Sequence, residues 1–132
     1  MRYLLDTCVL IADAAPALGA DAESAISVIS LSELHFGVLS ATSDRERAAR
    51  LRRLTLIEST LRALPVTDEV ARIHGAMSAH VKSLGRQPRP RAMDLLIAAT
   101  AAHHQATVLT ENIDDFSGLE EFVLVARPQR GA

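Results

Sequence analysis

The sequence has few of the features that would point to a secreted or membrane-embedded protein. Only one of its 132 residues is a cysteine, Cys8, so no disulfide can form within the chain. No apolar run approaches the roughly 18 residues of a transmembrane helix, and the N-terminus lacks the features of a signal peptide. We therefore expect a cytoplasmic protein without a membrane segment, in which Cys8 is a small buried side chain rather than a reactive thiol.

Aromatic residues and lysine are also scarce. The chain has three phenylalanines, one tyrosine and no tryptophan, so stacking of bases on an aromatic platform is not expected to dominate any binding of nucleic acid. Lys82 is the only lysine, and the other basic residues are arginines concentrated in the segments 45–53 and 86–91. Guanidinium groups bind phosphate in a bidentate way. These two segments are therefore either solvated surfaces or contacts for phosphate or an acidic partner.

The length and composition predict a single domain. Hydrophobic residues make up 48% of the chain, which is enough to bury a core without disulfides or metals as staples. We expect the domain to span residues 1–126 and residues 127–132 to form a frayed tail.

Short apolar runs alternate with helical patterns along the chain, which indicates an α/β fold with a mainly parallel sheet and helices on both faces. We expect loops at residues 14–22, 86–91 and 110–118. The expected strands are residues 2–5, 25–29, 64–66, 106–109 and 122–125. The expected helices are residues 7–13, about 31–41, a long helix that opens at Ser43, a helix from about 67 to Gly85, and the apolar segment 93–104.

Acidic residues recur at the positions where α/β folds bind ligands, at the carboxyl ends of parallel strands. Several ionised carboxylates at one place repel one another unless they share a cation or a proton. Mg²⁺ or Mn²⁺ suits such oxygen ligands, and the expected chemistry is metal-assisted cleavage of a phosphodiester. The candidates are Asp6 after the first strand, Glu33 after the second, Asp94 at the start of the apolar helix, and Asp114 or Asp115 after the strand at 106–109.

Each acid also has an ordinary structural interpretation. Ser30 and Glu33 have the spacing of a capping box, which would place Glu33 in the first turn of its helix. Asp94 would favour the amino end of a helix by its charge alone. Asp6 could be a simple turn residue, and the Asp114–Asp115 pair an ordinary loop. The five histidines lack the spacing of a zinc site and are expected to be structural or exposed.

Four segments resemble, in order and spacing, the motifs of the PIN domain family, and most of all the VapC-type toxins of bacterial toxin–antitoxin pairs. The segments are Leu4–Thr7, Ser32–Leu34 followed by Gly37, Met93–Ala101, and Thr110–Phe116. The resemblance implies an α/β/α sandwich and an endoribonuclease that depends on Mg²⁺ or Mn²⁺. It also implies a homodimer and a cognate VapB-type antitoxin that lies over the active-site groove.

The resemblance further implies roles for particular residues. The metal-binding and catalytic acids would be Asp6, Glu33, Asp94 and Asp115, with Asp114 as a neighbour. The supporting polar residues would be Thr7, Thr110 and Asn112. The candidate RNA contacts in the two arginine segments are Arg45, Arg52, Arg86, Arg89 and Arg91. The number of metal ions and the identity of a general base stay open.

Two other functions compete with this interpretation. A phospho-receiver domain would need adjacent acids after an early strand and a lysine after a late one, but Lys82 falls within an expected helix. An inactive PIN module that serves as an RNA or protein adaptor would keep the fold and lose the chemistry. Retention of all four acids favours the enzyme over the adaptor.

Overall fold

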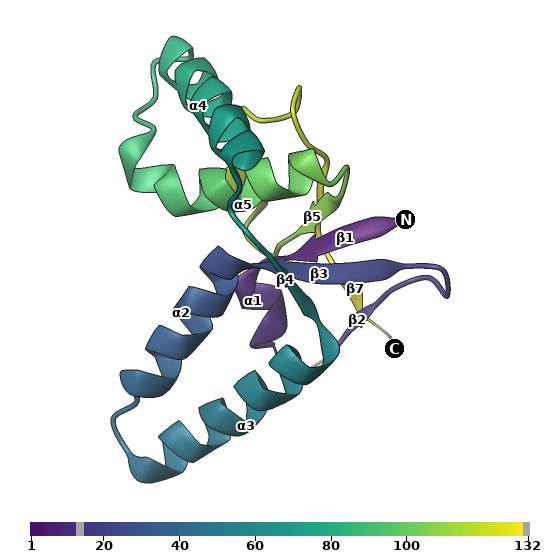
Figure 1. The fold of residues 1–132 in the computed structure, drawn as a ribbon, viewed down its shortest axis with the longest axis vertical. Coiled ribbons are helices and arrows are strands. Elements are labelled where there is room, and N and C mark those ends of the chain that lie inside the picture. Colours follow the sequence, from purple (N-terminus) through teal and green to yellow (C-terminus); the bar gives the residue numbers. More distant parts are fainter. Residues whose placement is uncertain (13–14, 131–132) are drawn as a thin grey trace.

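Five strands form a central sheet in which every pairing is parallel (Figure 1). The structure is a computed structural model that describes residues 1–12 and 15–130. The strand order is β4-β3-β1-β5-β6, so the first strand lies in the middle of the sheet. The expected α/β fold with a mainly parallel sheet is confirmed. The strands are β1 (Arg2–Leu5), β3 (Glu23–Ser27), β4 (Arg62–Leu64), β5 (Thr107–Leu109) and β6 (Val125–Ala126).

Helices cover both faces of this sheet. Figure 1 shows α4 (Asp68–Ser83) and α5 (Ala92–His103) on one side, and α1 (Thr7–Leu10), α2 (Val28–Leu39) and α3 (Asp44–Thr60) on the other. Helices α2 and α3 form a hairpin that extends away from the sheet. The expected α/β/α sandwich is therefore present. Among the described residues, no helix has the length and hydropathy that are needed to cross a bilayer.

The alternation of side chains along the strands divides the core between the two helical layers. Leu4 and Val108 pack on the side of α4 and α5, while their neighbours Leu5 and Leu109 pack on the side of α1, α2 and α3. All four side chains are buried. Since both faces of β1 are covered, its Tyr3-Leu4-Leu5 segment is an apolar run rather than an alternating pattern, which is why β1 is recognisable in the sequence.

The second strand and its helix meet earlier than the sequence predicted. The hydroxyl of Ser27 accepts a hydrogen bond from the backbone N–H of Ser30 at 3.1 Å, so Ser27 caps α2 and the helix begins at Val28. The expected strand at 25–29 thus ends at Ser27. The predicted capping box of Ser30 and Glu33 is wrong, and Glu33 lies in the second turn of α2.

Two segments that were expected to be irregular, residues 14–22 and the C-terminal tail, contain strands that pair with each other. Strand β2 (Pro16–Ala17) lies in the segment expected to be a loop, and it pairs antiparallel with β7 (Gln129–Arg130). Residues 129–130 of the expected frayed tail are therefore a strand, while 131–132 lie outside the described residues. Helix α1 ends at Leu10, earlier than predicted. The predicted end near residue 13 lies outside the described residues.

Several smaller boundaries shift in the same way. Strand β4 is an edge strand as expected but precedes the Pro65–Val66 pair, and β6 begins at Val125 instead of 122. Two segments expected to be irregular contain 3₁₀ turns, η1 (Arg89–Arg91) and η2 (Ile113–Phe116). By contrast, α4 stops as predicted: Gly85 has a φ of 81°, and the two backbone hydrogen bonds of a Schellman motif close the end of the helix.

Candidate metal-binding site

Asp6 lies at the carboxyl end of the central strand, where hydrogen bonds fix both its backbone and its side chain. Its side chain is 8% exposed, and its backbone N–H donates to the carbonyl of Leu109 at 2.9 Å, which ties the end of β1 to β5. One carboxylate oxygen, Oδ1, accepts the N–H of Thr7 at 2.9 Å and caps α1. The other, Oδ2, accepts the hydroxyl of Thr110 at 2.8 Å. The sequence therefore fixes one carboxylate at the middle of this edge.

Thr110 and Cys8 form a network beneath Asp6. Thr110 is fully buried after β5, and its Oγ1 accepts the N–H of Asn112 at 3.0 Å while donating to Asp6. The sulfur of Cys8 lies 3.6 Å from both Asp6 Oδ2 and Thr110 Oγ1, and it accepts the N–H of Glu111 at 3.4 Å. Cys8 is half-buried rather than fully buried, and its contact with Asp6 was not predicted.

Glu33 reaches the same edge from α2. Its side chain is exposed, and its Oε1 accepts the hydroxyl of Thr7 at 2.8 Å. Thr7 thus bonds to Asp6 through its backbone N–H and to Glu33 through its side chain. This residue connects two of the predicted acids, which agrees with the supporting role implied for it.

Asp94 joins the acids electrostatically from the first turn of α5. The pKa of its half-buried carboxyl is raised to about 6, first by burial and then by the negative charges of Asp115, Asp6 and Glu33. The positive charge of Arg91 opposes this rise. The three acids come from different parts of the fold, and the charge of each acts on the carboxyl of Asp94. Asp115, the predicted member of the Asp114–Asp115 pair, is the one whose charge acts on Asp94.

Two arginines hold the segment that carries Asp115. The Arg91 guanidinium donates to the carbonyl of Asp115 through Nε at 3.2 Å and Nη2 at 2.6 Å, and to the carbonyl of Ser117 at 3.0 Å. Arg86 donates to the hydroxyl of Ser117 at 2.7 Å and to its carbonyl at 3.2 Å. Arg86 and Arg91 were expected to contact RNA, but here their guanidinium groups position the backbone of an acidic turn.

The chemistry of these side chains fits a divalent metal, but the side chains are not arranged around a metal position. Carboxylate and hydroxyl oxygens are the ligands that Mg²⁺ and Mn²⁺ prefer, and the mutual repulsion at Asp94 is what a cation relieves. Within the described part of the chain, however, no three acidic, histidine or cysteine side chains are arranged so that they could hold an ion. Binding a metal would therefore require the carboxylates to turn toward one another.

A groove beside the acids is lined by arginines that the sequence did not single out. It has a volume of about 360 Å³ and runs between α1, α2 and α3, where Thr7 and Glu33 form one wall and Arg50 and Arg53 the other. Arg50 donates to the carbonyl of Gly37 at 2.6 Å and pairs with Glu46. Among the described residues, no carboxylate lies within ion-pair distance of Arg53.

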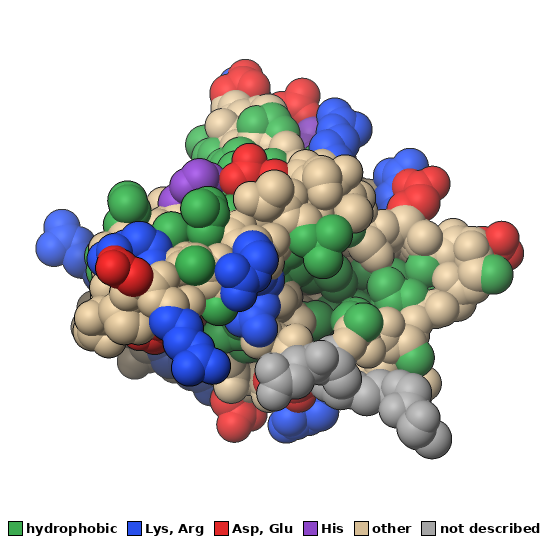
Figure 2. Space-filling model, turned by 90° about the horizontal axis from the view of Figure 1, so that it is seen from below, with side chains coloured by type: hydrophobic (Ala, Val, Ile, Leu, Met, Phe, Trp, Pro, Cys, Tyr) green, Lys and Arg blue, Asp and Glu red, His purple; other side chains and the backbone are tan. Residues whose placement is uncertain are grey.

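The other arginines of α3 face elsewhere. Arg45 and Arg52 are exposed and do not line this groove. Figure 2 shows basic side chains gathered over the side of the molecule where α3 lies, next to apolar surface. Arg50 and Arg53 are three residues apart and therefore share one face of the helix.

The fold defines a class, an α/β/α domain with a five-stranded parallel sheet, and Asp6 follows the central strand of that sheet. The chain belongs to the PIN domain family, which matches residues 3–121. It is 40% identical over 96 residues to Ribonuclease VapC5 from Mycobacterium tuberculosis (strain ATCC 25618 / H37Rv), a match that covers 73% of this chain and 68% of that protein. The predicted resemblance to PIN domains and VapC toxins is confirmed.

Solved structures agree with this assignment. A chain of VapBC-5 from Mycobacterium tuberculosis, a member of the VapBC family of toxin–antitoxin systems, superposes with a TM-score of 0.80 and 37% identity, covering 97% of this chain and 98% of that one. A chain of FitAcB from Neisseria gonorrhoeae gives a TM-score of 0.77 and 26% identity over 96% and 97% of the two chains.

Proposed function

We propose that this protein is an endoribonuclease that depends on Mg²⁺ or Mn²⁺ and acts as the toxin of a VapBC-type toxin–antitoxin pair in the cytoplasm. The proposal is supported by the two hydrogen bonds through which Thr7 links Asp6 to Glu33, and by the charges of Asp115, Asp6 and Glu33 that raise the pKa of Asp94. The 40% identical relative is named a ribonuclease, and the superposed VapBC-5 structure is of a toxin–antitoxin system, which supports the same assignment.

The four acids would hold the metal, which supplies charge stabilisation at the scissile phosphate and a more acidic water. Asp6 is fixed in place by Thr7 and Thr110, so it presents the same oxygens in every turnover. Thr7 orients Glu33 through its hydroxyl. Asp94 or Asp115 would orient the attacking water, and the geometry does not assign one of them as the base.

The groove beside Glu33 is the proposed path of the RNA backbone. Its Arg53 guanidinium has no acidic partner within ion-pair distance in the described residues, so it is available to a phosphate next to the one being cleaved. The apolar side chains of Ile11 and Leu34 line the same groove and suit an unstacked base or ribose. Arg45, Arg52 and Arg89 are exposed and would contribute only outer contacts.

We also propose that a VapB-type antitoxin inhibits the enzyme and that the toxin is a homodimer. A cluster of carboxylates attracts an arginine from an inhibitor, because charge-assisted pairs with guanidinium groups are strong. The superposed structures of VapBC-5 and FitAcB are consistent with such a partner. Analytical ultracentrifugation should give a dimer at micromolar concentration, and a strict monomer would refute that part of the proposal.

A cleavage assay tests the main proposal. Purified wild-type protein should cut RNA with Mg²⁺ or Mn²⁺ and stop with EDTA, and Asp94→Asn should lose the activity while remaining folded. Undiminished cleavage by Asp94→Asn would sink the proposal.

The alternative is an inactive PIN adaptor, which is favoured by one observation, the absence of a closed metal-binding group among the described residues. An adaptor would bind RNA without cutting it under any metal. The same assay, combined with a binding measurement on the uncut RNA, separates the two functions.

A further inference from the structure

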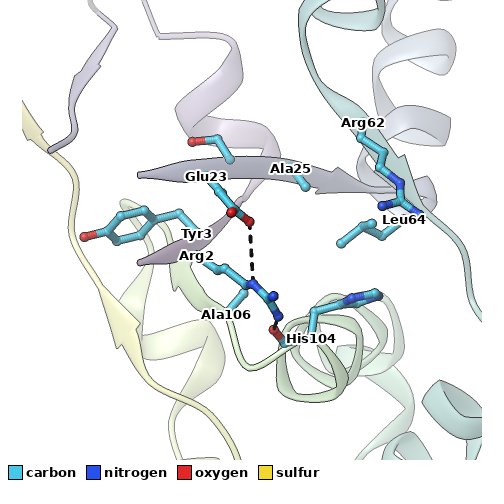
Figure 3. A pocket seen from close by; sticks show the side chains of 9 residues that line it. Arg2, Tyr3, Glu23, Ala25, Arg62, Leu64, His104 and Ala106 are labelled. Atoms are coloured by element: carbon cyan, nitrogen blue, oxygen red, sulfur yellow. Dashed lines mark hydrogen bonds and ion pairs between the residues drawn. The ribbon is translucent and has the colours of Figure 1, made fainter. Parts of the chain in front are cut away.

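A second pocket opens at the other end of the sheet, near the amino ends of β1, β3 and β4 (Figure 3). Its volume is about 240 Å³. Small apolar side chains form part of its lining, those of Ala25, Leu64 and Ala106, and the last turn of α5 approaches it from the side. Its lining also includes Arg2, Glu23, Arg62 and His104, with Tyr3 and Ser24 as further polar residues.

The two arginines of this pocket differ in their partners. Arg2 pairs with Glu23 at 3.5 Å and donates to the carbonyl of His104 at 3.0 Å, so its charge is largely balanced by a carboxylate and by the carboxyl end of α5. Arg62 has no carboxylate within ion-pair distance among the described residues. Figure 3 shows the side chains of Arg62 and His104 facing the same space.

The electrostatics at His104 indicate an excess of positive charge. Burial is the first cause that lowers the pKa of its imidazole, and the positive charges of His103, Arg62 and Arg2 lower it further. Glu23 is the one acidic side chain in the lining. The pocket therefore combines an unpaired guanidinium, a second basic side chain and an apolar surface, which is the combination that a phosphate ester requires.

We propose that this pocket binds a phosphate monoester of mononucleotide size, with Arg62 and His104 on the phosphate and the apolar lining against the ribose or base. Its volume lies just below the ~300–1,000 Å³ of pockets for drug-sized ligands, so it suits a small organic phosphate. The site is distinct from the acidic edge, because Arg2 begins the strand that Asp6 follows. It does not depend on the proposed nuclease function.

The proposal is tested by calorimetric titration of the full-length protein in EDTA, with AMP, inorganic phosphate and adenosine as probes. AMP should bind, and the other two probes should bind at least about tenfold more weakly, since each lacks one half of the recognised group. Arg62→Gln should weaken AMP binding by about tenfold through loss of a charge-assisted contact. Glu23→Gln should tighten it, because the variant removes the only carboxylate of the lining.

Arg53→Gln is the matched control, because Arg53 is also unpaired but lies in the groove on the acidic side. It should leave AMP binding unchanged. A second readout is the NMR titration of the His104 imidazole, assigned with His104→Gln: bound AMP should raise its pKa. EDTA removes any metal from the acids, so failure here is separate from failure of the nuclease proposal.

Three results would overturn the proposal. The first is no binding of AMP, or binding that Arg62→Gln leaves unchanged. The second is loss of binding in Arg53→Gln, which would place the nucleotide in the other groove. The third is equal binding of AMP and adenosine, or of AMP and inorganic phosphate, which would show that the pocket does not recognise a nucleotide-sized phosphate ester.

Discussion

The two ends of the parallel sheet carry opposite charge and are built differently. At the carboxyl ends, Asp6 is buried and bonded to Thr7 and Thr110, and its charge together with those of Glu33 and Asp115 raises the pKa of Asp94. At the amino ends, basic side chains surround a pocket in which Arg62 has no acidic partner among the described residues. Figure 1 places the start of the chain and the start of α1 at opposite ends of β1.

The two ends of the sheet differ in how they accommodate side chains of like charge. At the acidic end, threonine hydroxyls, a helix cap and two arginines that bind backbone carbonyls support the carboxylates, yet the repulsion that remains raises the pKa of Asp94. At the basic end, Arg2 pairs with Glu23 and donates to the carbonyl of His104, which caps the end of α5. Repulsion among carboxylates that are held in place by hydrogen bonds is typical of a site that binds a cation.

The largest effect is expected on RNA cleavage, which should depend on the acidic end of the sheet and not on the basic end. Asp6→Asn keeps the cap and the shape of the side chain but removes a charge that the metal needs, so RNA cleavage should fall by about 100-fold or more. Arg62→Gln, at the other end, should cleave within about twofold of wild type. Initial rates at saturating Mg²⁺ measure both. Equal losses in the two variants would mean that the ends are not functionally distinct.

A smaller effect concerns the support beneath the acids. Thr110→Val removes the hydroxyl that donates to Asp6 Oδ2 and accepts from the N–H of Asn112, so the carboxylate loses its fixed orientation. Removing such a supporting group costs roughly 10- to 100-fold in metal affinity or activity. The concentration of Mn²⁺ at half-maximal cleavage should rise accordingly. Thr110→Ser, which keeps the hydroxyl, should retain most of the activity, and a loss equal to that of Thr110→Val would refute the role of the hydrogen bond.

The groove on the acidic side gives a prediction about substrate binding. Arg53→Gln should raise KM for RNA by about tenfold with little change in kcat, because Arg53 would bind a phosphate away from the reacting atoms. Arg52→Gln, one residue along the same helix, should behave like wild type because its side chain lies outside the groove. Steady-state kinetics on a short single-stranded RNA would show the difference. A larger effect of Arg52→Gln than of Arg53→Gln would show that the RNA backbone does not follow this groove.

The smallest expected effect is on stability. The pKa of Asp94 is raised from 3.8 to about 6 on folding, so the folded state favours the protonated carboxyl and loses stability as the pH rises between these values. Without metal, Asp94→Asn should therefore raise the free energy of unfolding at pH 7.5 by about 1–2 kcal/mol, a figure reduced for solvent screening, and by close to zero below pH 4. Urea unfolding in EDTA at both pH values measures this. A variant less stable than wild type at pH 7.5 would contradict the repulsion among the acids.

The sequence predicted the features that local chemistry determines. The apolar run of β1, the stop of α4 at Gly85 and the buried helix α5 were found from composition and caps alone. The acids were identified by their positions after strands and by the family motifs. Convergence of Asp94 with Asp115, Asp6 and Glu33 on one edge was inferred from the rule for parallel sheets and stays a prediction, while the charges of these three acids do act on the Asp94 carboxyl.

Other features depended on contacts between distant parts of the chain. Strand β2 exists because Pro16–Ala17 pairs with the last described residues, more than a hundred positions away, and a two-residue strand has no periodicity to detect. The contacts of Arg86 and Arg91 were missed for the same reason, because no local pattern shows that a guanidinium donates to the carbonyls of a later turn. The start of α2 at Val28 was missed because Val28 and Ile29 are β-branched and resemble a strand.

The proposal that the four acids act as one cation site is tested most directly by the binding of Mn²⁺ in the absence of RNA. Electron paramagnetic resonance of free Mn²⁺ should show one or two ions bound per wild-type chain at pH 7.5. Binding should be greatly weakened in Asp94→Asn and unchanged in Arg62→Gln. Equal binding by wild type and Asp94→Asn, or no binding by either, would contradict the account.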